Sequence, residues 1–167
     1  MAKPVIKGSN SRSRLRLARR MAEALAGALP GRAVHVTDSA YAGAELKGLP
    51  PSVTWTTRLR KDAAPHGLPP ARVPGKKGRP RVRGDRLPPL AKMAATAAFT
   101  QVTVTRYGKE ATIRAAVITC LWYSVPGPRP VTVVPVRDKS ASGFDIALLT
   151  TGPAATAVQV IERYAAR

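Results

Sequence analysis

The stretch from Lys61 to Pro89 constrains the fold more than any other segment, because it cannot form a regular helix or strand. Seven prolines fall in it, at positions 65, 69, 70, 74, 80, 88 and 89, together with four glycines. Proline fixes φ and removes a backbone donor, and clustered glycines and prolines mark loops. We therefore predict one long loop here, with structured segments on both sides.

The same loop is strongly basic. Seven of the 28 Lys and Arg residues fall between positions 72 and 86, opposed by Asp85 alone: Arg72, Lys76, Lys77, Arg79, Arg81, Arg83 and Arg86. Seven more fall in residues 1–20, and with 9 acidic residues the formal charge is +19. Such a charge predicts a polyanionic partner, most commonly nucleic acid. The low aromatic content, 5%, argues against a protein that stacks single-stranded bases.

The composition excludes several classes of protein. One cysteine, Cys120, cannot form an intramolecular disulfide, and it cannot build a zinc finger with His35 and His66. No apolar run approaches the ~18 residues of a membrane span, so we expect no membrane partner. The basic N-terminus lacks the apolar region of a secretion signal, which predicts a cytoplasmic protein.

Before the loop, the pattern alternates between helix and strand. Apolar residues at three- and four-residue spacing predict a helix from Ser11 or Ser13 to Leu29, with Leu15, Ala18, Ala22, Leu25 and Leu29 on its buried face. We predict a strand over 33–38, a short helix over 39–47 and a strand over 53–58.

After the loop, the chain is rich in β-forming residues. We predict a short helix over 90–98, a hairpin of strands 101–107 and 111–121 around Gly108-Lys109, strands over 131–137 and 144–150, and a helix over 153–167. Trp55, Trp122 and Cys120 lie in predicted strands and are expected in the core. The fold class is therefore α/β.

Asp38 is the strongest candidate for a catalytic or metal-binding residue. A carboxylate at the carboxyl end of a buried strand lies where α/β sheets place ligands, and a carboxylate can bind Mg²⁺. The alternative is that Asp38 caps the helix that follows it. Spacing alone favours the cap, because the sequence offers no obvious second carboxylate nearby.

Five segments, in order along the chain, resemble the DDE transposases of bacterial insertion sequences. They are Val36-Thr37-Asp38-Ser39-Ala40-Tyr41, residues 54–63 (TWTTRLRKDA), Gly78-Arg79-Pro80-Arg81, residues 119–123 (TCLWY) and residues 160–167 (VIERYAAR). The resemblance spans nearly the whole chain and points to the group with a Tyr-Arg-Glu-Lys signature.

The resemblance implies an RNase H-like fold in which three carboxylates bind two Mg²⁺ ions and cut and join DNA by phosphoryl transfer. It implies a partial RNase H-like core in residues 1–60. The basic loop and a β-rich insertion in 61–130 would separate the last core strand from the catalytic helix. Residues 131–167 would return to the core, with the final helix cut short.

The resemblance also assigns residues. Asp38 matches the second carboxylate, which makes it the candidate catalytic and metal-binding residue. Tyr164 and Arg167 match the opening of the Tyr-x-x-Arg-x-x-x-Glu signature, whose Glu would follow residue 167, whereas Glu162 does not match. The first Asp would precede Met1. The resemblance thus implies a transposase truncated at both ends, which lacks two of three carboxylates and does not stably hold Mg²⁺.

Such a fragment is expected to bind double-stranded DNA without cutting it, and the full-length enzyme is expected to be capable of homo-oligomerisation. The candidate DNA-binding residues are Lys76, Lys77, Arg79, Arg81, Arg83, Arg86, Tyr164 and Arg167. The loop could clamp phosphates without reading sequence, or its Gly-Arg-Pro core could enter a narrow A·T-rich minor groove. The basic residues around the first helix, Arg12, Arg14, Arg16, Arg19 and Arg20, could form another phosphate-contacting face or simply face solvent.

Two other readings stay open from the sequence. The chain could be a small basic architectural protein that binds DNA through the 72–86 loop and has no need of Asp38. It could also be the product of a decayed gene that has no function.

Overall fold

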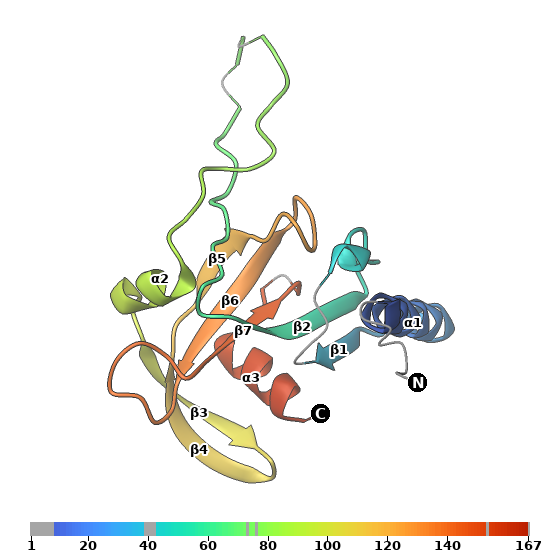
Figure 1. The fold of residues 1–167 in the computed structure, drawn as a ribbon. Helices are drawn as coiled ribbons and strands as arrows, with labels where there is room; N and C mark the ends of the chain where they lie inside the picture. The colour runs from blue at the N-terminus through green and yellow to red at the C-terminus, as the bar shows by residue number, and fades with distance from the viewer. Residues whose placement is uncertain (1–8, 39–42, 73, 76, 153, 167) are drawn as a thin grey trace, which may run out of the picture.

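The computed structural model describes residues 9–38, 43–72, 74–75, 77–152 and 154–166, with the backbone alone for 9–13 and 38. Its elements are, in chain order (Figure 1), α1 (Ser9–Ala28), β1 (Val34–Asp38), the 3₁₀ turn η1 (Ala44–Leu46), β2 (Val53–Leu59), α2 (Leu90–Thr96), β3 (Thr100–Arg106), β4 (Lys109–Ala115), β5 (Ile118–Leu121), β6 (Pro130–Arg137), β7 (Ile146–Thr150) and α3 (Ala157–Ala165). The mixed α/β class expected from the sequence is confirmed.

One curled sheet joins all seven strands in the order β1-β2-β7-β6-β4-β3, with β5 also paired to β6. Strands β1 and β2 are parallel, and the other pairs are antiparallel. Helices α1 and α2 pack against one face, over Trp55 and Val133 respectively, whereas α3 packs against the opposite face, over Val134 and Leu148. The arrangement is consistent with a DDE or RNase H-like fold.

The core predicted from the sequence is largely confirmed. Trp55 and Cys120 are fully buried, and burial raises the pKa of the Cys120 thiol to about 11. Trp122 is half-buried against the cluster that α2 covers. Within the described residues, no helix is long and apolar enough to cross a membrane.

The buried face of α1 differs from the predicted one. Leu15 and Ala22 are buried and Ala18 and Ala26 pack beside them, whereas Leu25 and Leu29 are exposed. The small alanines let the helix approach the sheet closely, so the leucine spacing does not decide which side is buried. Leu17, Met21, Leu25 and Leu29 instead form an outward apolar stripe, which we call the α1 stripe.

The β-rich part also corrects two details. The predicted strand 111–121 is two strands, because the chain leaves β3 at Ala115 and β5 then pairs with β6. The hairpin turn is Tyr107-Gly108 and not Gly108-Lys109, since Arg106 pairs with Lys109. Both turn residues have positive φ, 51° and 75°, as a two-residue type I′ turn requires.

The predicted short helix over 39–47 is reduced in the described residues to the single turn η1. Its first part, residues 39–42, lies outside the described residues. Arg19 of α1 donates to the carbonyl oxygens of Glu45 and Lys47, and it also pairs with Glu23 at 2.8 Å. Arg19 therefore fastens α1 to η1, and its role is structural.

Candidate nucleic-acid interface

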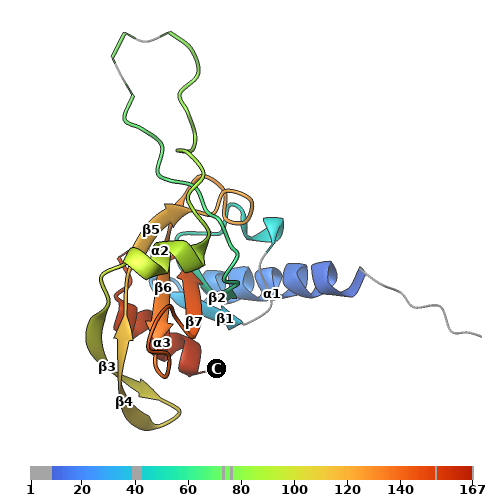
Figure 2. The ribbon, with the colours of Figure 1, turned by 60° about the vertical axis from the view of Figure 1, so that its left-hand side comes forward.

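The predicted loop forms a long arm that stands away from the sheet in both ribbon views (Figures 1 and 2). Its base is tied to β5 by two reciprocal backbone bonds between His66 and Leu121, with N···O distances of 2.9 and 2.8 Å. Leu87 then donates to the carbonyl of Pro65 at 2.8 Å. The arm therefore leaves the body at a fixed position, although its described residues form no helix or strand.

A narrow neck joins the two sides of this arm. Gly67 donates to the carbonyl of Asp85, and Gly84 donates to the carbonyl of Gly67, both at 2.9 Å. A Cβ at position 84 would lie 2.5 Å from the carbonyl oxygen of Leu68. Only glycine fits that approach of backbone to backbone, so Gly84 lets the neck close.

Beyond and around the neck, the arm presents its cations to solvent. Lys77, Arg79, Arg81, Arg83 and Arg86 are all exposed, as is Arg72. Asp85 pairs with Arg81 at 2.7 Å, but an exposed pair of this kind contributes only about 0–1 kcal/mol. The structure thus places five of the sequence-predicted DNA-binding residues on one exposed arm, whereas Lys76 lies outside the described residues.

The lower part of the arm is steadied by a ring contact. The guanidinium of Arg83 lies 5.4 Å from the centroid of the Tyr123 ring, just after β5. A cation over an aromatic face at this distance is attracted by the ring. Arg83 is therefore oriented by the body of the protein, while Arg79 and Arg81 lie further out along the arm.

Asp38 ends β1, and its register partner in the parallel strand β2 is Thr57. The side chain of Asp38 lies outside the description, so its role as a metal ligand remains a prediction. Thr57 is 1% exposed, and its hydroxyl has no hydrogen-bond partner in the described part of the chain. The carboxyl ends of β1 and β2 thus hold, beside the strand position of Asp38, a buried hydroxyl that has no partner among the described side chains.

Next to Thr57 in β2 lies a group of cations that the sequence did not single out. Arg58, Arg60 and Lys61 lie at the carboxyl end of β2, around a hollow of about 460 Å³. Arg60 pairs with Asp62 at 3.2 Å, and the Lys61 ammonium lies 5.5 Å from the centre of the Phe144 ring. The available signal was three cations within four residues at the end of a predicted strand.

Two acids line this hollow, and both are engaged: Asp62 pairs with Arg60, and Asp145 is held by its own loop. The Asp145 carboxylate accepts from the Ser140 hydroxyl and from the backbone N–H groups of Asp138 and Lys139, at 2.7 and 2.9 Å from the two nitrogens. These bonds hold the pKa of Asp145 well below its ordinary value. The carboxylate is thus held by its own loop, which leaves Arg58 and Lys61 without an acidic partner among the described residues.

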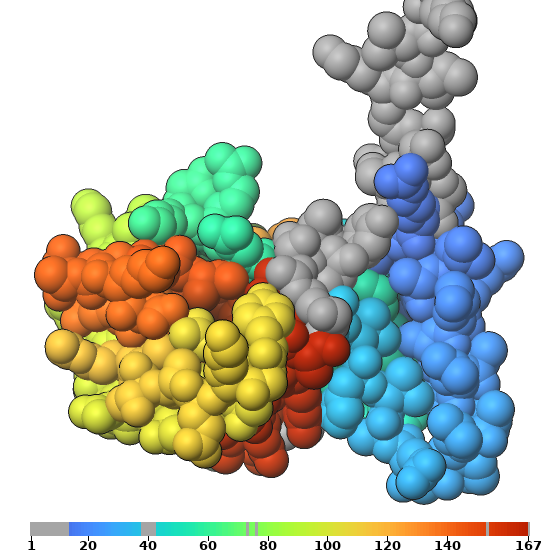
Figure 3. All heavy atoms as spheres, turned by 90° about the horizontal axis from the view of Figure 1, so that it is seen from below, coloured from blue at the N-terminus to red at the C-terminus, as the bar shows by residue number. Residues whose placement is uncertain are grey.

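Helix α3 reaches the same end of the sheet. Its N-cap residue is Thr156, whose hydroxyl accepts from the Gln159 N–H in a capping box. Its last turn lies beside the carboxyl end of β1 in both ribbon views (Figures 1 and 2). From below, the helix fills the space between the β3–β4 hairpin and β1 (Figure 3). The last turn of α3 and the carboxyl end of β1, which are distant in sequence, therefore lie at the same end of the sheet (Figures 1 and 2).

Two residues of α3 have structural partners. Tyr164 is 7% exposed and packs among Val134, Leu148 and Ile161, so it is a core residue of α3, and its contact with DNA stays a prediction. Glu162 accepts a hydrogen bond from the backbone N–H of Thr105 at 2.9 Å, which fastens α3 to β3. Arg167 lies outside the described residues.

His35 lies on the face of β1 that is turned toward α3, and it is exposed. His35 Nδ1 lies 2.5 Å from the Thr54 hydroxyl. Desolvation, and then the charge of Arg163, lower the pKa of His35. His35 is therefore bonded to its neighbour strand β2, and among the described side chains it belongs to no group of three or more residues that could hold a metal ion.

The described residues do not fit a two-metal centre. They contain no group of three or more His, Cys, Asp or Glu side chains that could hold a metal ion. Two-metal phosphoryl transfer needs several oxygen ligands that fix both ions. No metal-dependent step follows from the residues described.

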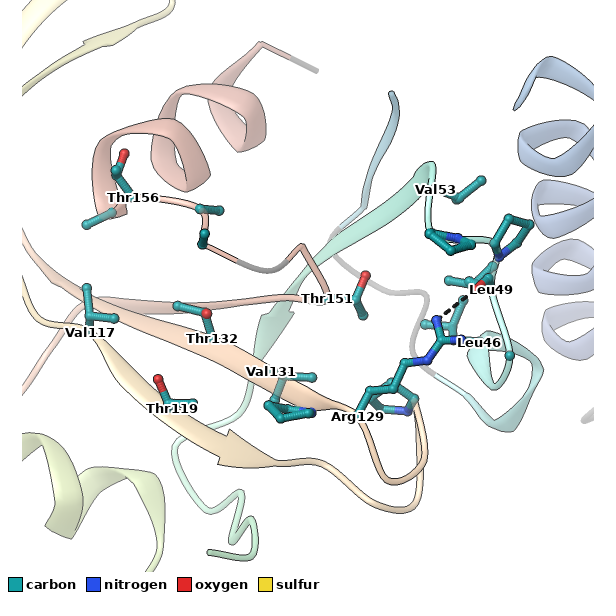
Figure 4. Close-up of a pocket in the computed structure, with 18 residues that line it drawn as sticks. Leu46, Leu49, Val53, Val117, Thr119, Arg129, Val131, Thr132, Thr151 and Thr156 are labelled. Atoms are coloured by element: carbon teal, nitrogen blue, oxygen red, sulfur yellow. Dashed lines mark hydrogen bonds between the residues drawn. The ribbon is translucent and has the colours of Figure 1, made fainter. Parts of the chain in front are cut away.

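A large apolar pocket lies at the other end of the sheet (Figure 4). It has a volume of about 870 Å³ and is lined mainly by aliphatic side chains and prolines, among them Leu46, Leu49 and Val131. Its cation, Arg129, donates to the carbonyl of Leu49 at 2.8 Å. Val53, at the start of β2, lines this pocket, whereas Asp38 lies at the other end of the β1–β2 pair. The pocket is therefore separated from Asp38 by the length of these two strands.

Comparison with known families agrees with this geometry. A family model described as DDE superfamily endonuclease matches residues 5–124, more than half of the chain. The chain therefore belongs to the DDE endonuclease and transposase family, whose nucleases act on nucleic acid and generally use divalent metal ions. No curated protein and no solved structure matched the chain.

Proposed function

We propose that this chain binds double-stranded DNA through the basic arm and does not cleave it on its own. The observation that carries this proposal is the set of exposed cations on an arm that is anchored to β5. Among the described residues, Asp85 is the acid that pairs with one of these cations, Arg81. Flexible exposed Lys and Arg side chains contact phosphates irrespective of base sequence. Membership of a family that acts on nucleic acid supports the same partner.

The cations at the carboxyl end of β2 extend this surface toward Asp38. Arg58 and Lys61 have no acidic partner among the described residues, and Lys61 opens the segment that becomes the arm. A phosphate backbone held by the arm could therefore continue past the end of β1. We propose that Arg58, Arg60 and Lys61 assist Arg79, Arg81, Arg83 and Arg86 in binding DNA.

For the chemistry, we propose Asp38 as one of the three family carboxylates, with Mg²⁺ as the metal of the complete enzyme. Its position at the end of β1, beside β2 and the last turn of α3, supports that role. A single carboxylate would neither hold two ions nor orient an attacking oxygen. We therefore propose that this chain binds DNA without cleaving a strand. We propose homo-oligomerisation only for the complete enzyme.

We further propose that the chain holds only part of an RNase H-like core. Two observations support this. In the described residues β1 pairs only with β2, so one edge of the sheet is open, and the α1 stripe lies exposed on the helix that covers β1. Open edges and apolar stripes ordinarily require a covering element. We assign residues 1–60 and 131–167 to the core and 61–130 to the insertion.

Salt dependence of DNA binding tests the proposal. Anisotropy of a labelled mixed-sequence duplex would be measured from 50 to 300 mM salt, for the wild type and for a variant with Arg79, Arg81, Arg83 and Arg86 changed to Gln. Each lost phosphate contact should flatten the slope of log affinity against log salt by about 0.9, so we expect a change of up to about 3.6.

The matched control removes four exposed cations elsewhere, with Arg32, Lys92, Lys109 and Arg114 changed to Gln. It lowers net charge equally, so it should weaken binding much less if the arm is the interface. Equal slopes for the two variants would show that only net charge matters. Failure of the wild type to bind DNA at all would overturn the proposed function.

A further inference from the structure

The outer part of the arm has a shape that phosphate binding alone does not require. Residues 77–83 read Lys-Gly-Arg-Pro-Arg-Val-Arg, with a cation at every second position. They form neither helix nor strand, and all are exposed. The chain bends at Gly78 and again at Val82 and Arg83, so the outer arm presents a short unbent segment, Arg79-Pro80-Arg81, with an arginine on each side of the proline.

Two residues set the form of this chain. Gly78 has a φ of +110°, a conformation that L side chains rarely adopt, and no neighbouring atom crowds it. Pro80 fixes its own φ and disfavours a helical conformation at Arg79. A bend at Gly78 is thus followed directly by the extended unit Arg79-Pro80-Arg81, on the rim of a hollow of about 280 Å³ that Pro70 and Arg72 of the other side also line.

The grooves of DNA differ in what they admit. The major groove is about 12 Å wide and takes a helix or a two-stranded ribbon, whereas the minor groove is about 6 Å wide. The minor groove is narrower still in A·T-rich tracts, where its negative potential is strongest and attracts inserted arginine. A single extended chain with arginines on both sides of a proline suits the narrow groove.

Arginine is better suited than lysine to such a site. Its guanidinium is planar and less strongly hydrated, so it loses less on leaving water for a confined groove. The Arg81–Asp85 pair is exposed and weak, so it can give way to DNA. Arg83, held against Tyr123, would remain at the base of the arm.

We propose that Gly78-Arg79-Pro80-Arg81 inserts into an A·T-rich minor groove, with the guanidinium groups of Arg79 and Arg81 along its floor. This inference rests on the proposed function, because it assumes that the arm binds DNA. It adds a preference for sequence that a phosphate clamp lacks. The remaining cations of the arm would contact the phosphates that flank the groove.

The test compares three duplexes of equal length, containing a central tract of A·T, G·C or inosine·C pairs. Guanine places its N2 amino group in the minor groove, and inosine lacks that group while keeping the major-groove pattern of guanine. Minor-groove insertion predicts tight binding to the A·T and inosine·C duplexes and about tenfold weaker binding to G·C. Netropsin, which occupies A·T minor grooves, should displace the protein from the A·T duplex.

The decisive variant is the double substitution Arg79→Lys and Arg81→Lys, which keeps the charge of the arm. We expect it to lose the A·T preference while its affinity for the G·C duplex stays within about twofold. The matched control, Arg32→Lys with Arg114→Lys, should keep the preference.

The outcomes separate the two proposals. A wild type that binds all three duplexes equally, or a lysine variant that keeps the preference, would overturn minor-groove insertion and leave DNA binding by the arm intact. If the protein bound the A·T duplex tightly and both other duplexes weakly, it would be reading the major groove. That result would also overturn minor-groove insertion. No binding to any duplex would overturn both proposals.

Discussion

Asp38 and Thr57 are register partners at the carboxyl ends of the parallel strands β1 and β2, and the buried Thr57 hydroxyl has no hydrogen-bond partner in the described part of the chain. Its neighbour Thr56 is equally buried, but the Thr56 hydroxyl donates to Thr150 Oγ1 at 3.1 Å. Among the described side chains, one threonine of β2 therefore has a hydrogen-bond partner and its neighbour has none. The latter lies beside the proposed catalytic residue.

This difference predicts opposite effects of the same substitution. Thr57→Val removes an unpaired buried hydroxyl and should raise the free energy of unfolding by about 1 kcal/mol. Thr56→Val removes one partner of a hydrogen bond and should lower it by about 1 kcal/mol. Urea unfolding of both variants measures the two effects. A loss of stability in Thr57→Val would show that its hydroxyl is satisfied in solution.

The two sides of α1 predict a second contrast. Leu15 is 5% exposed and packs with Leu46 and Trp55, whereas Leu17 is 59% exposed. We expect Leu15→Ala to cost about 2–5 kcal/mol of unfolding free energy and Leu17→Ala to cost less than about 0.5 kcal/mol. Thermal or urea unfolding tests this. Equal costs would mean that the α1 stripe is covered in solution, for example by self-association.

The Asp145 carboxylate predicts a dependence of stability on pH. Its hydrogen bonds depress the pKa in the folded state, so the folded chain binds the proton more weakly than the unfolded chain. Its contribution is fully present above the unfolded pKa of about 3.9 and is lost as the pH falls below that value. The stability difference between wild type and Asp145→Ala should therefore stay constant from pH 6 to about pH 5 and shrink as the pH falls from about 4 to 3 and below.

Asp62 provides the control for this prediction, because it makes only an exposed pair with Arg60. Asp62→Ala should leave the pH profile of the wild type nearly unchanged. If Asp145→Ala instead lost stability in parallel with the wild type down to pH 3, the hydrogen-bonded carboxylate would not be the cause.

Local patterns in the sequence predicted much of this fold. Proline and glycine delimited the arm, and β-branched runs located most of the strands, including β2 with its buried Trp55. What they missed depends on long-range pairing. The break between β4 and β5 follows from the pairing of β5 with β6, and nothing in residues 111–121 signals it.

The candidate site was predicted in part for similar reasons. The cations of the arm are visible as a charge cluster, and Asp38 as a carboxylate that ends a strand. Arg58 and Lys61 were missed because only the fold shows that the acid beside them, Asp145, is held by its own loop. The structural role of Arg19 depends on carbonyls 26 and 28 residues away, which a helical charge pattern cannot indicate.

The most direct test of the account separates binding from cleavage. Purified protein would be incubated with supercoiled plasmid in Mg²⁺ or Mn²⁺, at a concentration where a gel shift shows the plasmid fully bound. We predict complete binding with no nicking above the metal-and-buffer control, and the same result for Asp38→Ala. Nicking by the wild type that Asp38→Ala abolishes would contradict the account, because it would mean that this chain assembles a working catalytic centre.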